Sequence, residues 1–231
     1  MYTLYIGNKT YSSWSLRPWL LMRELNISFE ERLTPFEDGG SYQTFREFSP
    51  SGLVPCLHDQ DTAVWDSMAI TEYLAEHHTR VWPESPGARA WARSIAAEMH
   101  AGFKTLRNQC PMAIGLKVAL AQRSAELHRD LSRLDEIWCY GLNTFGGPFL
   151  AGNRFTAADA FFAPVAFRID TYGLTLSQPA NDYARRLLSL AGMQLWARAA
   201  LVEPYKDTRQ EDQISRVGNI IEDRRTPQAE R

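Results

Sequence analysis

Residues 11 to 19, which read YSSWSLRPW, hold the side chains with the clearest chemical potential in this chain. A proline is tolerated in the first turn of a helix, so a helix capped by Ser15 would place Pro18 at its third position at little cost. Ser12 and Ser13 would then lie free at the positive end of that helix. Hydroxyl donors and the helix dipole there would lower the pKa of a thiol, whether it belongs to the protein or to a bound ligand. The alternative is that all three serines only cap the helix and turn the chain.

Two further pairs of residues stand where a strand or a helix begins. Pro55 lies between a turn and a short apolar run, a position that a sheet allows to proline. The sequence alone favours a trans bond here, whereas a cis bond would leave the main chain of Val54 open to an extended ligand. Asp66 and Ser67 precede the segment MAITEYL, and either can be the N-cap of a helix. The start of that helix could also hold a carboxylate.

The elements that would position these residues follow from the hydrophobic pattern. A strand is expected at 2–6, a helix at 15–25, a second strand at 29–33 and a short helix at 42–48. A hairpin of VPCLH and TAVWD then leads into a helix at 67–78. The order is β-α-β-α-β-β-α, and a linker with two prolines and a glycine follows it.

No convincing strand is expected beyond the linker. Long helical patterns cover 88–109, 117–142 and 155–173, and one or two shorter helices fall within 180–201. The segment at 155–173 is apolar nearly all round, which predicts a buried helix, and Thr156 with Asp159 resembles a capping box at its start. The tail from residue 203 is charged, and its end is predicted to be disordered. The fold class is therefore α/β plus all-α.

Composition excludes several classes of function. The 231 residues are 45% hydrophobic and 23% charged, as in soluble globular proteins, and the net charge of −2 gives no pull toward nucleic acid or anionic membranes. No run of about 20 apolar residues and no signal peptide is present, so a cytoplasmic protein is expected. Cys56, Cys110 and Cys139 form no CxxC pair, and the rings of His77 and His78 point to different faces of a helix, so no metal site is expected.

Four motifs in order resemble the glutathione transferases: SSWSLR, LVPCL, WDSMAITEYL and GNRFTAADAFFAPV. The resemblance covers about residues 1 to 205 and is to the serine-type, bacterial-like members with some zeta-class character. SSWSLR is similar to the zeta pattern SSCxxxR, although Trp14 stands in place of its cysteine. The resemblance implies a thioredoxin-like glutathione-binding domain over 1–80, an all-helical domain forming the electrophile pocket over 88–205, and a charged tail over 206–231.

The resemblance implies that a serine donates a hydrogen bond to the sulfur of glutathione and favours the thiolate. The zeta pattern matches Ser12 to this role, while the spacing leaves Ser12 and Ser13 both open. Ser12 and Ser15 also have the spacing of the two cysteines in thioredoxin-like redox proteins.

The remaining site residues follow from the same resemblance. Val54, before a cis Pro55, would pair main chain to main chain with the cysteinyl part of glutathione. Asp66 would face the γ-glutamyl ammonium, and the N–H of Ser67 would face its carboxylate. The electrophile pocket would include one face of the first long helix of the helical domain, namely Met99, His100, Phe103 and Arg107, although interhelical packing is an equal alternative for these residues.

The expected function is a glutathione transferase of detoxification type that conjugates glutathione, as co-substrate and without a metal, to a small electrophile. A cytoplasmic homodimer is implied. One alternative is a glutathione-dependent cis–trans isomerase of the maleylacetoacetate type. Another is a non-catalytic binding module with the same fold. The sequence identifies neither the electrophile nor the role of the tail.

Overall fold

A computed structural model describes residues 1–226 of the chain. Its N-terminal domain contains a mixed four-stranded sheet in the order β2-β1-β3-β4. The bounds are Tyr2–Ile6 for β1, Phe29–Leu33 for β2, Cys56–Asp59 for β3 and Thr62–Trp65 for β4. β2 runs parallel to β1, whereas β3 is antiparallel to both β1 and β4. The parallel pair needs a crossover, which α1 supplies.

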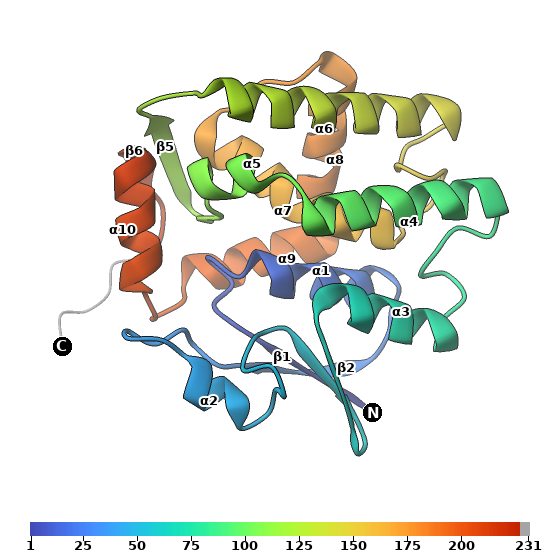
Figure 1. Ribbon diagram of the computed structural model, residues 1–231, viewed down its shortest axis with the longest axis horizontal. Helices are drawn as coiled ribbons and strands as arrows, with labels where there is room; N and C mark the ends of the chain where they lie inside the picture. Colours follow the sequence, from blue (N-terminus) through green and yellow to red (C-terminus); the bar gives the residue numbers. More distant parts are fainter. Residues whose placement is uncertain (227–231) are drawn as a thin grey trace.

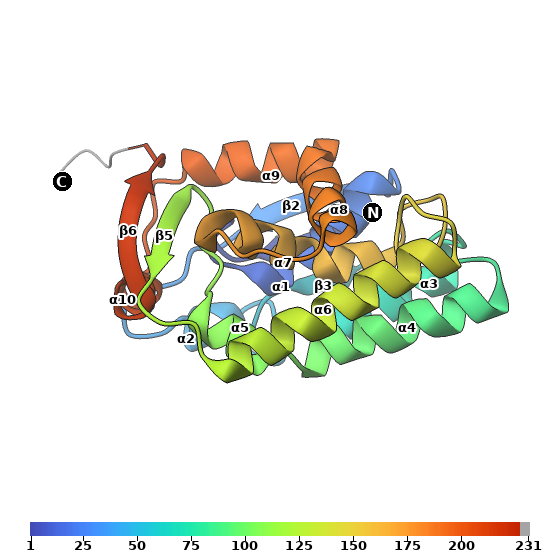
Figure 2. The ribbon, with the colours of Figure 1, turned by 90° about the horizontal axis from the view of Figure 1, so that it is seen from above.

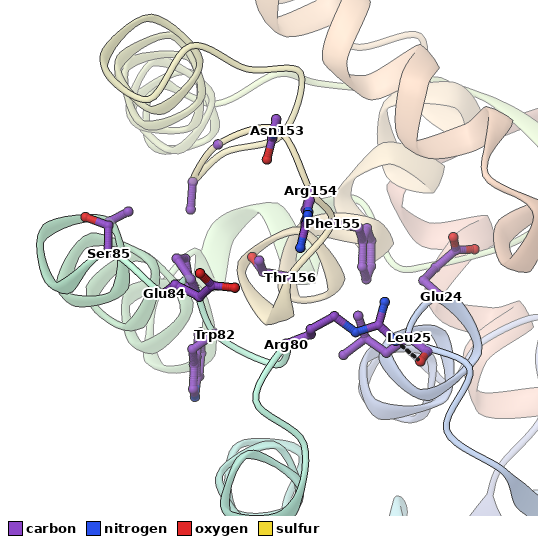
Figure 3. A pocket seen from close by; sticks show the side chains of 14 residues that line it. Glu24, Leu25, Arg80, Trp82, Glu84, Ser85, Asn153, Arg154, Phe155 and Thr156 are labelled. Carbon is purple, nitrogen blue, oxygen red and sulfur yellow. Dashed lines mark hydrogen bonds between the residues drawn. The ribbon is translucent and has the colours of Figure 1, made fainter.

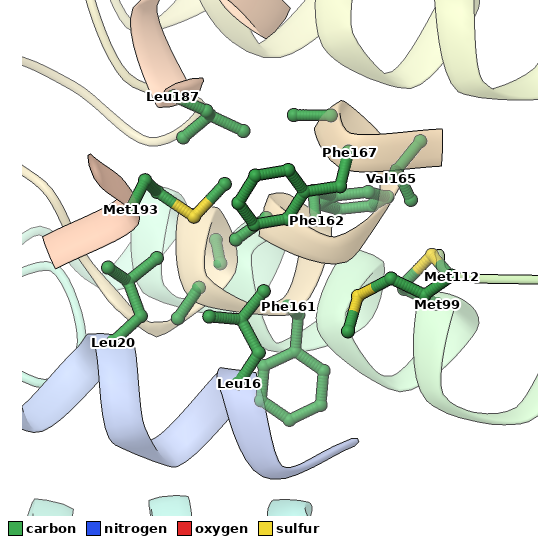
Figure 4. Packing of buried hydrophobic residues seen from close by; sticks show 14 of the residues in the cluster. Leu16, Leu20, Met99, Met112, Phe161, Phe162, Val165, Phe167, Leu187 and Met193 are labelled. Carbon is green, nitrogen blue, oxygen red and sulfur yellow. The ribbon is translucent and has the colours of Figure 1, made fainter. Parts of the chain in front are cut away.

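Three helices complete this domain, with bounds Ser13–Glu24 for α1, Tyr42–Arg46 for α2 and Ser67–His77 for α3. α1 lies between the sheet and the helical domain (Figure 1). Its side chains Leu16 and Leu20 are fully buried and face Phe161 and Met193 of the helical domain (Figure 4). The core is thus continuous across both domains, so α1 is held from both sides.

The helical domain surrounds α7, which spans Ala157–Tyr172. The other helices are α4 (Pro86–Ala101), α5 (Lys104–Gln109), α6 (Ala125–Thr144), α8 (Gln178–Ser189) and α9 (Ala191–Leu201). Nearly every residue of α7 is buried, as predicted for this segment. The predicted capping box is also present, since the Thr156 N–H donates to Asp159 Oδ2 at 2.9 Å. The predicted fold class, α/β plus all-α, is confirmed.

Two expectations about the helical part were wrong. The helix expected over 88–109 breaks at Gly102, because Phe103 adopts a left-handed conformation with φ of 56°. The part of the chain beyond the linker also contains two strands, β5 (Leu116–Leu120) and β6 (Gly218–Asp223). They pair antiparallel with each other. β5 occupies the start of the helix expected over 117–142, which begins only at Ala125. Each strand is short and has its partner about a hundred residues away, and β6 has only two apolar residues, so no local pattern reveals the pair.

The charged tail folds onto the body of the protein. α10 (Thr208–Val217) and β6 lie at the end of the molecule where β5, α5 and α2 also lie (Figure 2). The disorder predicted for the end of the tail concerns residues 227–231, which lie outside the described residues. Within residues 1–226, no helix is long and apolar enough to cross a membrane.

Candidate functional site

The first turn of α1 differs from expectation. The helix begins at Ser13 with Ser12 as its N-cap, so the assignment of Ser15 as the N-cap was wrong. Pro18 is consequently the sixth helical residue instead of the third. A proline in this place cannot donate to the carbonyl of Trp14, and in a helix interior it costs about 3 kcal/mol. This cost is tolerated because α1 is packed between the two domains.

The three serines have different partners. Ser12 Oγ donates to Ser15 Oγ at 2.7 Å, and Ser15 Oγ accepts the N–H of Gly7 at 3.3 Å. The hydroxyl of Ser13 makes no hydrogen bond to any residue that the structure describes. Ser12 and Ser15 therefore form a local network, while Ser13 keeps a free hydroxyl at the positive end of α1.

Ser12 and Ser13 line a cavity of about 270 Å³ between the two domains. Val54 and Trp14 contribute to its N-terminal wall, and the helical domain supplies Arg107 and Arg168. The other lining residues are Tyr11, Phe36, Phe45, Leu53, Asn108, Pro111, Met112, Gln210 and Gln213. Two of these, Gln210 and Gln213, come from α10, so the tail forms part of this site.

The peptide bond between Val54 and Pro55 is cis, as the resemblance implied. Among the described residues, neither the N–H nor the C=O of Val54 has a hydrogen-bond partner. Main-chain N–H and C=O groups usually have hydrogen-bond partners. Because those of Val54 lack partners within residues 1–226 and lie on a cavity wall, they can bind an extended peptide as they would bind an added strand.

Asp66 and Ser67 lie beside this cavity and do not line it. Asp66 is the N-cap of α3, and its Oδ1 accepts the N–H of Met68 at 2.7 Å. Its backbone is strained, with φ of 72° in a non-glycine residue. Such strain persists where the surroundings enforce it, often at functional sites. The N–H of Ser67 makes no hydrogen bond within residues 1–226, which leaves a donor for a carboxylate at this helix start.

Arg17 and His100 cover this pair. Arg17 Nη1 donates to Ser67 Oγ at 3.3 Å and lies 3.4 Å from His100 Nδ1, and His100 Nε2 lies 3.5 Å from Asp66 Oδ2. Burial lowers the pKa of Arg17, and neighbouring arginines lower it further. Burial also lowers the pKa of His100, which favours the neutral imidazole at neutral pH.

Of the four residues expected in the electrophile pocket, Arg107 is the one that lines this cavity. Met99 is buried in the core (Figure 4), and Phe103 is buried where the chain passes from α4 to α5. His100 faces Asp66 and Arg17, as described above. Across the break in the helix, Arg107 still donates to the carbonyl of Met99, and the side chains of His100 and Arg107 both pack on the ring of Trp14.

Sequence reasoning named only Ser12, Ser13, Val54 and Arg107 among the residues of the cavity wall, and the residues that it missed include Arg168, Gln210 and Gln213. Arg168 carried a usable signal, because it is a basic residue that directly follows the apolar run from Ala160 to Phe167 in a helix expected to be buried. Gln210 and Gln213 carried none, since they lie in a segment expected only to be a charged tail.

A larger cavity, of about 470 Å³, lies near the linker (Figure 3). Glu24 and Leu25, at the end of α1, form one side of it, and Arg80 donates to the carbonyl of Leu25 at 3.0 Å. With 12 residues in α1, this end is about 18 Å from Ser13. The cavity contains none of the predicted site residues, so its size alone does not make it the active site. Within the described residues, no cluster of His, Cys, Asp or Glu could hold a metal ion.

Comparison with family models and with known proteins shows what this chain is similar to. The model described as "Glutathione S-transferase, N-terminal domain" matches residues 11–77, and the one described as "Glutathione S-transferase, C-terminal domain" matches residues 89–188. The maleylacetoacetate isomerase of Rattus norvegicus is 24% identical over 199 residues, which cover 83% of this chain and 90% of that protein. The glutathione S-transferase-like protein OpS6 of Beauveria bassiana is 25% identical over 202 residues, covering 83% of this chain and 89% of that protein.

Solved structures show the same fold. A glutathione transferase homolog from Burkholderia with bound glutathione superposes with a TM-score of 0.64 at 21% identity, over 86% of this chain and 97% of that one. A theta class glutathione S-transferase from Xanthomonas axonopodis pv. citri, also with glutathione bound, gives a TM-score of 0.61 at 20% identity, over 85% of this chain and 96% of that one.

Proposed function

The chain belongs to the glutathione S-transferase family, and from this premise we propose that it binds glutathione and conjugates it to a small electrophile. The thiolate sulfur of glutathione attacks the electrophilic carbon, a carbon–sulfur bond forms, and the leaving group departs with the electron pair of its bond. In a chloro-nitroaromatic acceptor the leaving group is chloride. The thiol proton passes to solvent.

The free hydroxyl of Ser13 on the cavity wall carries this proposal. Ser12 donates to Ser15, so its proton is already engaged, whereas Ser13 has no partner among the described residues. Ser13 therefore donates to the sulfur, and Ser12 positions the turn. Together with the dipole of α1, this hydrogen bond stabilises the thiolate. Lowering the thiol pKa by two units would be worth about 2.7 kcal/mol and would raise the ratio of thiolate to thiol roughly a hundredfold.

The rest of glutathione extends along the domain interface. Its cysteinyl main chain pairs with the free N–H and C=O of Val54. Its γ-glutamyl carboxylate binds the N–H of Ser67 at the start of α3, and Asp66 faces the ammonium. Arg17, which donates to Ser67 Oγ, adds a positive charge beside that carboxylate.

Alanine variants of the two adjacent serines test this assignment. We expect Ser13→Ala to move the pKa of the bound thiol toward its free value of about 8.5 and to lower kcat/KM at neutral pH by about 10- to 100-fold. Ser12→Ala should have a smaller effect on that pKa. The measurements are the ultraviolet absorbance of the bound thiolate against pH and the turnover of a chloro-nitroaromatic acceptor.

The control is Ser94→Ala, a serine on the exposed side of α4. If Ser12→Ala shifts the thiol pKa and Ser13→Ala leaves it unchanged, Ser12 is the activating residue. If the wild type binds no glutathione, the chain is a non-catalytic binding module.

A second candidate is glutathione-dependent isomerisation, which the names of several relatives favour. In this reaction glutathione adds to the substrate and leaves again, so substrate is converted without net loss of thiol. Incubation with maleylacetoacetate and a thiol assay decides between the two reactions. We also expect a homodimer, which light scattering on the purified protein would test.

A further inference from the structure

The cavity beside Ser13 is strongly cationic. Arg107 from α5 and Arg168 from α7 both line it, and none of its lining residues is acidic. The polar residues on its wall are otherwise amides and hydroxyls. Asn108 and two glutamines of α10, Gln210 and Gln213, can donate hydrogen bonds alongside the guanidinium groups.

Neither arginine is paired with a carboxylate among the residues that the structure describes. Arg168 Nη1 donates to the carbonyl of Cys110, and its buried Nε has no partner. Arg107 donates to the carbonyls of Met99 and of Gly102, the latter at 3.2 Å. By contrast, Arg225 elsewhere in the protein bonds two carboxylates. Arg107 is half-buried and has Asp130 as an acidic neighbour, whereas Arg168 is buried without a counter-ion in the described chain. A buried charge without a counter-ion is costly, so an anion beside Arg168 in this cavity would be stabilised.

The electrostatic environment supports the same conclusion. Burial lowers the pKa of Arg168 to about 10, and the charge of Arg107 contributes in the same direction. Arg168 remains protonated at neutral pH because this pKa stays well above it. Arg17 is a third cation nearby, and the charges of Arg107 and Arg168 lower its pKa. An anion between the arginines would relieve this mutual repulsion.

The two arginines belong to the wall that faces the thiol site. Ser13 and Val54 line the cavity from the N-terminal domain, whereas Arg107 and Arg168 come from the helical domain. We propose that the electrophile conjugated at Ser13 carries a carboxylate group, which Arg107 and Arg168 bind. This inference rests on the proposed function. The amides of α10 complete the subsite.

Two acceptors that differ only in charge test the inference. They are para-chloro-meta-nitrobenzoate and the corresponding benzamide. The catalysed rate of each is divided by the rate of its own uncatalysed reaction with glutathione. We expect the wild type to prefer the benzoate by about 10- to 100-fold, the range for a hydrogen bond to a charged group. Arg168→Gln should bring the preference close to one, and Arg168→Lys should restore part of it.

Arg107→Gln is the second variant, in case Arg168→Gln does not fold, and it should reduce the preference in the same way. Arg186→Gln, on the exposed side of α8, is the matched control and should keep the wild-type ratio. Equal rates for both acceptors in the wild type, or an unchanged ratio in both glutamine variants, would overturn the inference while leaving the conjugation reaction intact.

Two binding measurements separate the remaining outcomes. Calorimetric titration of nitrobenzoate and nitrobenzamide, with and without S-methylglutathione, should show tighter binding of the benzoate. Equal binding of the two compounds overturns the inference, and this test does not require turnover. If no acceptor is turned over, the proposed conjugation fails, and the binding data still decide the inference. The third comparison is glutathione with its glycine amide. If Arg168→Gln weakens the binding of glutathione but not that of its glycine amide, the arginines hold the glycine carboxylate and the inference is wrong.

Discussion

Single hydrogen bonds divide the serines at the start of α1 into two kinds. Ser15 is fully buried and links Ser12 Oγ to the N–H of Gly7, the residue that follows β1. Ser13 has a hydroxyl with no partner in the described chain. Removing a partner from a buried hydrogen bond leaves the other group unsatisfied, whereas removing a free hydroxyl does not. Stability and catalysis should therefore depend on different serines.

We expect Ser15→Ala to lower the free energy of unfolding by about 1–3 kcal/mol, because Ser12 Oγ and the Gly7 N–H both lose their acceptor. Ser13→Ala should change it by less than about 0.5 kcal/mol. Urea unfolding followed by tryptophan fluorescence measures both. A loss of stability in Ser13→Ala comparable to that of Ser15→Ala would show that the Ser13 hydroxyl is structural, contrary to its assignment to the thiol.

At the scale of elements, α10 is fastened to the loop that precedes the serines. Tyr11 donates to Glu211 of α10 at 2.5 Å, and Arg225 beyond β6 donates to the same carboxylate at 2.6 Å. Arg225 also bonds Asp223 at 2.8 Å. The side chain of Arg225 is buried, so this pairing is protected from solvent more than a surface ion pair. The network keeps the α10 wall of the cavity in place.

This network predicts that α10 loosens in acid. Burial raises the pKa of Glu211, but hydrogen bonds from Arg225 and Tyr11 outweigh burial and hold the pKa below its ordinary 4.5. The Arg225 hydrogen bond likewise lowers the pKa of Asp223. Because both native pKa values are depressed, the stabilisation is complete above about pH 4.5 and is lost as the pH falls through the lowered values.

Amide hydrogen exchange of residues 208–226 measures this effect as protection factors, which correct for the intrinsic pH dependence of exchange. Protection should fall in the wild type as the pH drops below about 4.5. In Glu211→Gln it should already be low at pH 6 and should change less. If the two proteins lose protection in parallel, carboxylates outside this network control α10.

Local patterns predicted the elements whose partners are nearby or whose composition is distinctive. α7 is apolar on all sides and has a capping box, so its burial and its start at Thr156 both followed from sequence. The break at Phe103 did not, because nothing local forbids a continuous helix there. β5 and β6 could not be predicted, since each needs a partner about a hundred residues away. For the same reason, the α10 side of the cavity could not be predicted from the sequence.

At the scale of the whole molecule, the C-terminal part of the chain holds the loop that leads to the serines. Both carboxylate oxygens of Glu203 accept main-chain N–H groups, from Lys9 at 2.6 Å and from Thr10 at 3.1 Å. Trp196 donates to the carbonyl of Lys9 at 2.8 Å. Residues separated by more than 180 positions thus fix the geometry that precedes α1. If the first domain activates a thiol as proposed, that activation depends on folding of the second.

Glu203→Gln tests this dependence. A carboxylate accepts at both oxygens, whereas an amide presents one acceptor and one NH₂ group, so the N–H of either Lys9 or Thr10 would lose its partner. We expect the free energy of unfolding to fall by about 1–3 kcal/mol and the Ser13-dependent lowering of the thiol pKa to weaken. Glu76→Gln, an exposed change on α3, is the matched control and should alter neither quantity. A Glu203→Gln protein with wild-type stability and a wild-type thiol pKa would show that the loop holds its geometry by local contacts alone.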